Sequence, residues 1–150
     1  MTDKIENSDI VKHILINLFD ISRRKTTEVY AFTILDSSLR KLEEKYNFLK
    51  NVKIRDTRFI EDEYSVSVMS EINLIPPNEI GKAIHDIVIL TNNTLGKNAG
   101  FFFIKELSHN VGDDYRTIMR DIGINLDLIQ LENEVAQLEK TLIRPRKTEK

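Results

Sequence analysis

The sequence contains no cysteine and no tryptophan, and it has only three prolines and five glycines among its 150 residues. The absence of cysteine excludes a disulfide framework, a thiolate nucleophile, cysteine-ligated zinc and an iron–sulfur cluster. The few glycines and prolines leave little room for low-complexity linkers, and 41% apolar residues are too many for a disordered chain. We therefore expect one folded domain over residues 1–150, with flexible tails at residues 1–7 and 144–150.

Long apolar runs and targeting signals are also missing. No uninterrupted apolar run is longer than that at residues 101–104, which has four residues, whereas a membrane-spanning helix needs about 20. The N-terminal segment is polar and acidic, unlike a secretory signal peptide, which begins with basic and then apolar residues. We therefore expect a cytoplasmic protein that makes no contact with a membrane.

Positive and negative charges are distributed unevenly along the chain. Residues 1–60 carry 12 Lys+Arg and 9 Asp+Glu, residues 61–139 carry 5 and 14, and residues 140–150 carry 5 and 1. The net charge of −2 is therefore a cancellation between blocks of opposite sign. Because opposite potentials attract, this pattern favours contact between the blocks, within one chain or between subunits. The alternative is that the charges belong to solvated helix faces.

The spacing of apolar residues predicts a mainly helical α+β fold, with about five or six helices around a β-hairpin. Outside residues 52–74, apolar residues recur at intervals of three and four, which is the period of an amphipathic helix. Residues 28–35 are also rich in β-forming types, so a strand there remains open beside the helix that we prefer. Residues 91–100 include two threonines, three asparagines and two glycines, so we expect a break in the helix there.

The period changes to two from Val52 onward, where apolar and polar residues alternate. This alternation predicts a β-hairpin, roughly 52–60 paired with 63–74, and the acidic run 61–63 forms the turn. An isolated hairpin is marginally stable in water. We therefore expect the hairpin to lie on helices or to extend across a subunit interface.

The most specific pattern is a heptad repeat in the last helix, which we expect from about Asn125 to Leu142. Its apolar residues follow one another at spacings of four and three without a break: Ile124, Leu128, Leu131, Val135, Leu138 and Leu142. Such a stripe is typical of a helix that packs against another helix. The residues predicted to bind a partner in this way are Leu128, Leu131, Val135, Leu138 and Leu142. The alternative is that this helix docks on its own core.

Acidic residues flank the heptad stripe on both sides. Asp127 and Glu134 fall at one flanking position of the heptad, and Glu132 and Glu139 fall at the other. Two copies of this helix would therefore oppose like charges, at a cost of only tenths of a kcal/mol per exposed pair. A basic neighbour would suit the stripe better. The candidates are Arg40, Lys41 and Lys45, on the second helix of this chain or of its twin.

The densest aromatic cluster consists of Phe101, Phe102 and Phe103. Three consecutive residues cover most of the circumference of a helix, so at least one ring points away from whatever buries the others. We assign the cluster to an interface and count its three residues among those that bind a partner. The alternative is a pocket for a small molecule or haem near this cluster and His109.

Glu106 and His109 form a Glu-x-x-His pair, the spacing with which di-iron helical bundles point two ligands inward. Such a site needs two copies of the pair, and the sequence holds one. A surface glutamate and histidine is the preferred interpretation, so Glu106 and His109 are weak metal candidates. We predict no metal and no cofactor.

Residues 115–134 partly fit a helix-turn-helix motif, with Gly123 in the turn. The fit fails at Met119, where a small residue usually lets the helices approach, and at Glu132, which occupies a normally apolar position. The second helix of this motif is also acidic, and DNA presents a dense line of phosphate charge. Binding to nucleic acid is therefore disfavoured.

These observations lead to a hypothesis of function. We expect a non-enzymatic regulatory or scaffolding domain. It is expected either to form a homo-oligomer, namely a dimer, or to bind a helical protein partner. The first alternative is a small-molecule or haem-type sensor domain with a pocket near residues 101–103. The second is a nucleic-acid-binding regulator with a degenerate helix-turn-helix at residues 115–134. No residue is predicted to be catalytic, because no nucleophile elbow, Cys-His pair or metal motif accompanies the histidines.

Overall fold

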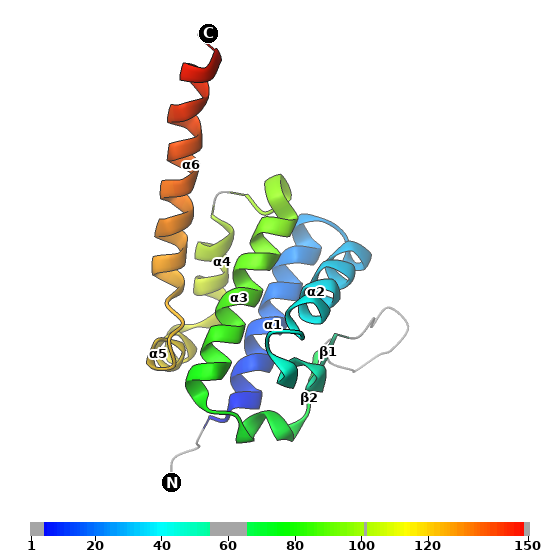
Figure 1. Cartoon of the computed structure of the whole chain (residues 1–150). Helices are drawn as coiled ribbons and strands as arrows, with labels where there is room; N and C mark the ends of the chain where they lie inside the picture. The colour runs from blue at the N-terminus through cyan, green and yellow to red at the C-terminus, as the bar shows by residue number, and fades with distance from the viewer. Residues whose placement is uncertain (1–4, 55–65, 101, 149–150) are drawn as a thin grey trace.

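The mainly helical α+β fold is confirmed by a computed structural model, which describes residues 5–54, 66–100 and 102–148 and side chains up to residue 139. The described residues form six α-helices and one two-stranded antiparallel sheet (Figure 1). The α-helices are α1 (Asn7–Lys25), α2 (Glu28–Leu42), α3 (Pro77–Leu95), α4 (Phe103–Val111), α5 (Asp113–Asp121) and α6 (Leu126–Thr148). The strands are β1 (Val52–Ile54) and β2 (Val66–Val68), and the 3-10 helices are η1 (Asn47–Asn51), η2 (Ser70–Leu74) and η3 (Gly96–Asn98).

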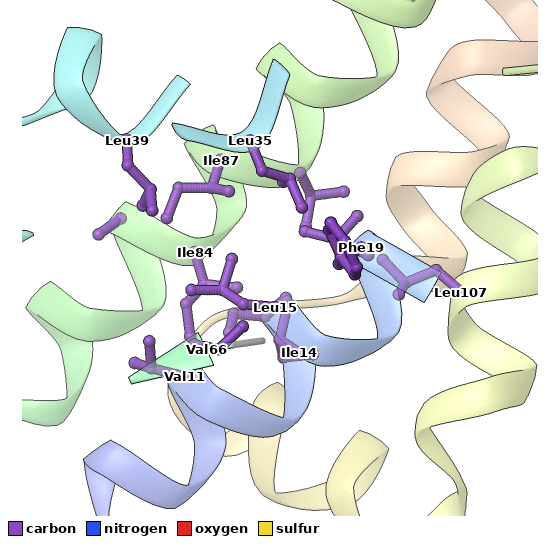
Figure 2. Packing of buried hydrophobic residues seen from close by; sticks show 14 of the residues in the cluster. Val11, Ile14, Leu15, Phe19, Leu35, Leu39, Val66, Ile84, Ile87 and Leu107 are labelled. Atoms are coloured by element: carbon purple, nitrogen blue, oxygen red, sulfur yellow. The ribbon is translucent and has the colours of Figure 1, made fainter. Parts of the chain in front are cut away.

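Helix α1 forms the centre of the hydrophobic core. It packs against α2, α3 and α4 and against strand β2, and its buried side chains form one broad apolar face. Figure 2 shows Leu15 and Phe19 of α1 among Leu35 of α2, Ile84 of α3 and Leu107 of α4. Polar residues such as Lys12 and Asp20 lie on the other side of α1, so the helix is amphipathic, and its apolar face needs the neighbouring elements to cover it.

The chain is anchored to the body from the first turn of α1. Glu6 and Asp9 form a capping box at the start of this helix. The side-chain amide of Asn7 donates hydrogen bonds to the backbone oxygens of Ile72, at 3.2 Å, and Ile75, at 2.7 Å. Helix α1 therefore begins at Asn7, within the N-terminal tail expected at residues 1–7. Of the N-terminal tail expected at residues 1–7, residues 1–4 lie outside the described residues.

Residues 28–35 are helical, as preferred from the spacing of their apolar residues. Thr27 caps α2, and its side-chain oxygen accepts a hydrogen bond from the backbone nitrogen of Tyr30 at 3.1 Å. The helix ends at Leu42, whereas the three-and-four spacing continues through Tyr46 and Leu49. Both of these later residues are still buried, from the turn after α2 and from η1.

The hairpin is present but shorter than predicted. Val52 pairs with Val68, and Ile54 pairs with Val66. The predicted extension of the second strand to Leu74 is wrong, because residues 70–74 form η2. On a strand Ile72 and Leu74 would share one face, whereas η2 places Ile72 in the core and leaves Leu74 83% exposed. The predicted turn at 61–63 and the predicted strand residues 55–60 and 63–65 lie outside the described residues. The described part of the hairpin lies on α1 and α2, the first of the two expected arrangements.

The expected break between residues 91 and 100 occurs at Gly96. This residue has φ +56°, a left-handed conformation that favours glycine, and it ends α3. Proline 77 occupies the first turn of α3, where its missing N–H removes no helical hydrogen bond. Among the described residues, no helix is long and apolar enough to cross a membrane.

Helix α6 lies at the edge of the bundle and extends away from it. Its N-terminal half packs against α4, whereas its C-terminal half projects beyond the other helices (Figure 1). The helical backbone continues to Thr148, past the end expected at Leu142 and through most of the tail predicted at residues 144–150. A helix of this length spans about 35 Å. Helix α6 is therefore attached to the helical bundle only through its N-terminal half.

Candidate interaction surface on the last helix

One face of α6 attaches the helix to the body of the protein. Leu126, Ile129 and Gln130 on this face are buried. The side-chain oxygen of Gln130 accepts a hydrogen bond from the backbone nitrogen of Lys105 at 3.0 Å. That N–H lies in the first turn of α4, where backbone N–H groups have no hydrogen-bond acceptor within their own helix. The Gln130 side chain therefore supplies the missing acceptor and fixes α6 against α4.

The opposite face of α6 carries the predicted heptad residues, and it is open to solvent. The apolar stripe consists of Leu128, Leu131, Val135 and Leu138, whose exposed fractions are 50%, 55%, 46% and 61%. At about 100° per residue, these side chains point half a turn away from the face that contacts α4. The stripe therefore does not dock on its own core. Ile124 precedes the helix and is buried, and the side chain of Leu142 lies outside the described residues.

The face that contacts α4 was not identified from the sequence. Leu126 and Ile129 are three residues apart, which places them side by side on a helix, but they fall outside the heptad register. Gln130 is polar, a residue type that is mostly exposed, so its burial could not be read from the spacing of apolar residues. The spacing of Leu126 and Ile129 was the only pattern that could have revealed a second apolar face.

The flanks of the apolar stripe are uniformly acidic. No lysine or arginine occurs between Asp121 and Glu139, and acidic side chains border the stripe on both sides. On one side, Glu134 accepts a hydrogen bond from the side-chain nitrogen of Gln130 at 2.9 Å. This bond holds one carboxylate beside the stripe. The surface is thus an exposed row of aliphatic side chains with carboxylates along both of its edges.

The basic residues proposed as neighbours for these carboxylates serve other contacts in their own chain. Arg40 pairs with Asp36 and Glu43 and donates a hydrogen bond to the backbone oxygen of Val52 at 2.7 Å. Lys45 pairs with Asp86 at 3.2 Å. Helix α2 lies on the far side of the bundle from α6 (Figure 1). The idea that the acidic flanks meet α2 within one chain is therefore wrong, although Lys41 is exposed.

The phenylalanine cluster is divided between the core and the surface. Phe103 is fully buried among residues of the hydrophobic core, so its assignment to a partner interface is wrong. Phe102 is 54% exposed, and the Lys105 ammonium lies 5.5 Å from the centre of its ring. Phe101 lies outside the described residues. Neighbouring positions on a helix point in different directions, which explains why the cluster does not act as a unit.

A cleft of about 160 Å³ lies between α3, α4 and α6. Its lining residues are Ile89, Asn92, Asn93, Ile104, Ile129, Glu132 and Asn133. Pockets for drug-sized ligands usually enclose about 300 Å³ or more, and haem is larger still. This cleft is therefore too small for a haem-type cofactor, and the buried Phe103 ring does not line it.

Of the two weak metal candidates, Glu106 forms ion pairs and His109 is exposed. The carboxylate of Glu106 pairs with Arg24 at 3.5 Å and with Lys25 at 3.3 Å, which ties the start of α4 to the end of α1. His109 is exposed to solvent. In the part of the chain that the structure describes, no group of three or more His, Asp or Glu residues could hold a metal ion.

Residues 115–134 do form two helices joined by a short turn, α5 and α6, with Gly123 at φ +101° in the turn. Met119 of α5 is fully buried. Arg116 pairs with Asp113 and donates a hydrogen bond to the backbone oxygen of Ser108 at 2.7 Å, so this cation is used inside the protein. The second helix presents acidic residues, which phosphate would repel. The geometry gives no support to nucleic-acid binding by α6.

A polar cluster around Asp86 was missed from the sequence. The Asp86 carboxylate accepts hydrogen bonds from the Tyr46 hydroxyl at 2.7 Å and from the Lys45 ammonium at 3.2 Å. Burial raises the pKa of Asp86, but these hydrogen bonds and one from His85 outweigh burial, so the pKa lies below its usual value. Tyr46 and Asp86 are 40 residues apart, and the cluster ties the segment after α2 to α3.

Replacing Tyr46 by phenylalanine should reduce stability in a pH-dependent way. The lowered pKa of Asp86 means that its contacts stabilise the fold above about pH 4 and lose effect as the pH falls further. We expect Tyr46→Phe to lower the free energy of unfolding by about 1 kcal/mol at pH 7 and by less at pH 2.5. Urea unfolding at both pH values measures the difference. The half-exposed Tyr30→Phe is the matched control, and an equal loss at both pH values would contradict the argument.

Comparison with known proteins finds no matching family model, no similar curated protein and no similar solved structure. The inference of function therefore depends on the surface of α6.

Proposed function

We propose that the chain is a non-enzymatic regulatory or scaffolding domain of the cytoplasm that binds an α-helix of a second protein chain along the apolar stripe of α6. The second chain is either another copy, which would make a homodimer, or a different helical protein. The observation that carries the proposal is the exposure of Leu128, Leu131, Val135 and Leu138 in an unbroken heptad register. A helix pair buries such a stripe as a coiled coil.

The energetics favour this use of the stripe. Fully burying an exposed aliphatic side chain contributes about 1.5–3 kcal/mol, and these four side chains are already about half buried. Their further burial, together with that of the partner's side chains, would contribute several kcal/mol. The stripe lies on the face of α6 that points away from α4, so a second helix could lie along it without displacing the core.

The double substitution Leu131→Asp and Leu138→Asp should abolish helix binding by the full chain. Two buried carboxylates in the contact would remove apolar area and add a desolvation cost. Two measurements cover both kinds of partner. Sedimentation equilibrium of the full chain detects a second copy, and fluorescence anisotropy detects a labelled three-heptad peptide with Leu at a and d and Gln at e and g.

The matched control is Leu74→Asp combined with Met69→Asp, since both side chains are exposed and lie in or beside η2, away from α6. We expect this variant to associate as the unsubstituted chain does, and both variants to keep the same circular dichroism spectrum. If the unsubstituted chain neither self-associates nor binds the peptide at about 100 μM, or if the control loses binding as well, the proposed function fails.

A further inference from the structure

We propose that the helix bound by the apolar stripe of α6 is basic: an amphipathic helix of another protein whose own apolar stripe is flanked by lysine or arginine on both sides. This inference rests on the proposed function and names the class of partner. It combines three observations, namely the charge beside the stripe, the poor fit of a second copy, and the ion pairs that Arg24, Lys25, Arg40 and Lys45 form within their own chain.

The first observation is the sign of the charge along the exposed part of α6. Between residues 127 and 139 the helix has four acidic residues and no basic one. Glu132 and Glu139 occupy the e positions on one side of the stripe, and Asp127 and Glu134 occupy the g positions on the other. In a helix pair, e and g residues face the flanks of the partner helix. A partner helix with lysine or arginine at its own flanking positions would therefore place each cation near a carboxylate of α6.

The second observation is that a second copy of α6 fits this surface poorly. In a parallel pair, Glu134 of one copy lies near Glu139 of the other. In an antiparallel pair centred on the described part of the stripe, Glu132 faces its own copy, and so does Glu134. Symmetry repeats each unfavourable contact. Every such pair costs only tenths of a kcal/mol, so the charges select among partners more than they prevent a homodimer.

The third observation concerns the cations of the chain itself. Arg40 and Lys45 bind Asp36, Glu43 and Asp86 within their own chain. The pairs of Arg24 and Lys25 with Glu106 hold α1 against α4. These contacts would have to break before the same cations could reach α6 of another copy. A basic helix from a different protein needs no such rearrangement.

Three synthetic peptides test the inference. All have three heptads with Leu at a and d, and they differ only in carrying Lys, Gln or Glu at e and g. We expect the full chain to bind the lysine peptide about tenfold more tightly than the glutamine peptide, since each of four charge pairs contributes a few tenths of a kcal/mol. Binding of the glutamate peptide should be weaker than that of the glutamine peptide. Raised salt should reduce these differences, because the charges are exposed.

Two controls separate helix recognition from simple charge attraction. A lysine peptide of the same composition with its leucines scrambled out of the heptad register should not bind. The triple variant Glu132→Gln, Glu134→Gln and Glu139→Gln should bind the lysine and glutamine peptides equally, since it keeps the apolar stripe and loses most of the flanking charge. Fluorescence anisotropy at low and at high salt measures each affinity.

The outcomes distinguish this inference from the proposed function. If the lysine and glutamine peptides bound equally well, the inference of a basic partner would be overturned, but the proposed binding of a helix would still stand. A dimer of the full chain that the Leu131→Asp, Leu138→Asp variant abolishes would identify a second copy as the occupant, and it would overturn the inference in the same way. If no peptide binds and no dimer forms, both proposals fail.

Discussion

Replacing Gly81 by alanine should destabilise the protein by about 2 kcal/mol or more, although the residue lies inside helix α3. In an exposed helix the same change stabilises by up to about 1 kcal/mol, because glycine has the larger conformational entropy to lose. At this position, an added Cβ would overlap the backbone oxygen of Ile122 and lie 2.9 Å from its carbonyl carbon. Backbone atoms cannot rotate aside as a side chain can, so α3 and the α5–α6 turn would have to separate.

Thermal and urea unfolding measure this effect. For a protein of this size, a loss of about 2 kcal/mol corresponds to a fall of roughly 4–8 °C in Tm. Lys82→Ala is the matched control, because Lys82 is the next residue of α3 and its side chain is 63% exposed. We expect less than about 0.5 kcal/mol there. A Gly81→Ala variant as stable as the unsubstituted protein would show that α3 does not approach the α5–α6 turn so closely.

Replacing Phe103 by alanine should cost about 3–5 kcal/mol, the usual result of removing a fully buried phenylalanine. The Phe103 side chain has no exposed surface and belongs to the hydrophobic core, at the start of α4. Folded domains are stable by only about 5–15 kcal/mol, so this single change would remove a large part of the total. Chemical denaturation, followed by circular dichroism, measures the loss.

The adjacent residue supplies the control for this prediction. Phe102→Ala removes the same side chain from a position that is 54% exposed, where the ring lies near the Lys105 ammonium. We expect a loss of under about 1 kcal/mol for this variant. Equal losses at the two positions would contradict the division of the cluster into one core residue and one surface residue.

The apolar stripe of α6 was predicted correctly from its spacing, but the spacing was compatible with either a buried or an exposed stripe. Its heptad spacing predicted a helix with an apolar face, and α6 is that helix. The spacing also allowed the stripe to be covered by the protein's own core. In the structure Ile129 and Gln130 face α4 instead, and Leu131 points to solvent. Both faces of the helix hold apolar residues, so periodicity by itself could not decide which face docks.

In the hairpin, the alternation of apolar residues predicted one part of the structure correctly and another part wrongly. Alternation located strand β1 and the start of β2, where alternate residues point to opposite faces of the sheet. It failed at Ile72 and Leu74: on a strand these two side chains would share one face, whereas the 3-10 helix buries Ile72 and leaves Leu74 exposed. The side-chain oxygen of Asn73 accepts a hydrogen bond from the backbone nitrogen of Ser8 at 2.8 Å, which fastens η2 to the start of α1. A bond between residues so distant in sequence leaves no trace in local spacing.

Local sequence was thus sufficient for the helical segments, for a break within residues 91–100, for the presence of a hairpin and for the acidic flanks of the last helix, because each depends on residues that are close together in the sequence. The packed structure decided which apolar residues were covered. It placed Phe103 in the core, brought Gly81 against Ile122 and joined Tyr46 to Asp86 across 40 residues. It also left the stripe of α6 exposed. A spacing pattern shows that a helix has an apolar face, but what covers that face depends on the arrangement of all the elements around it.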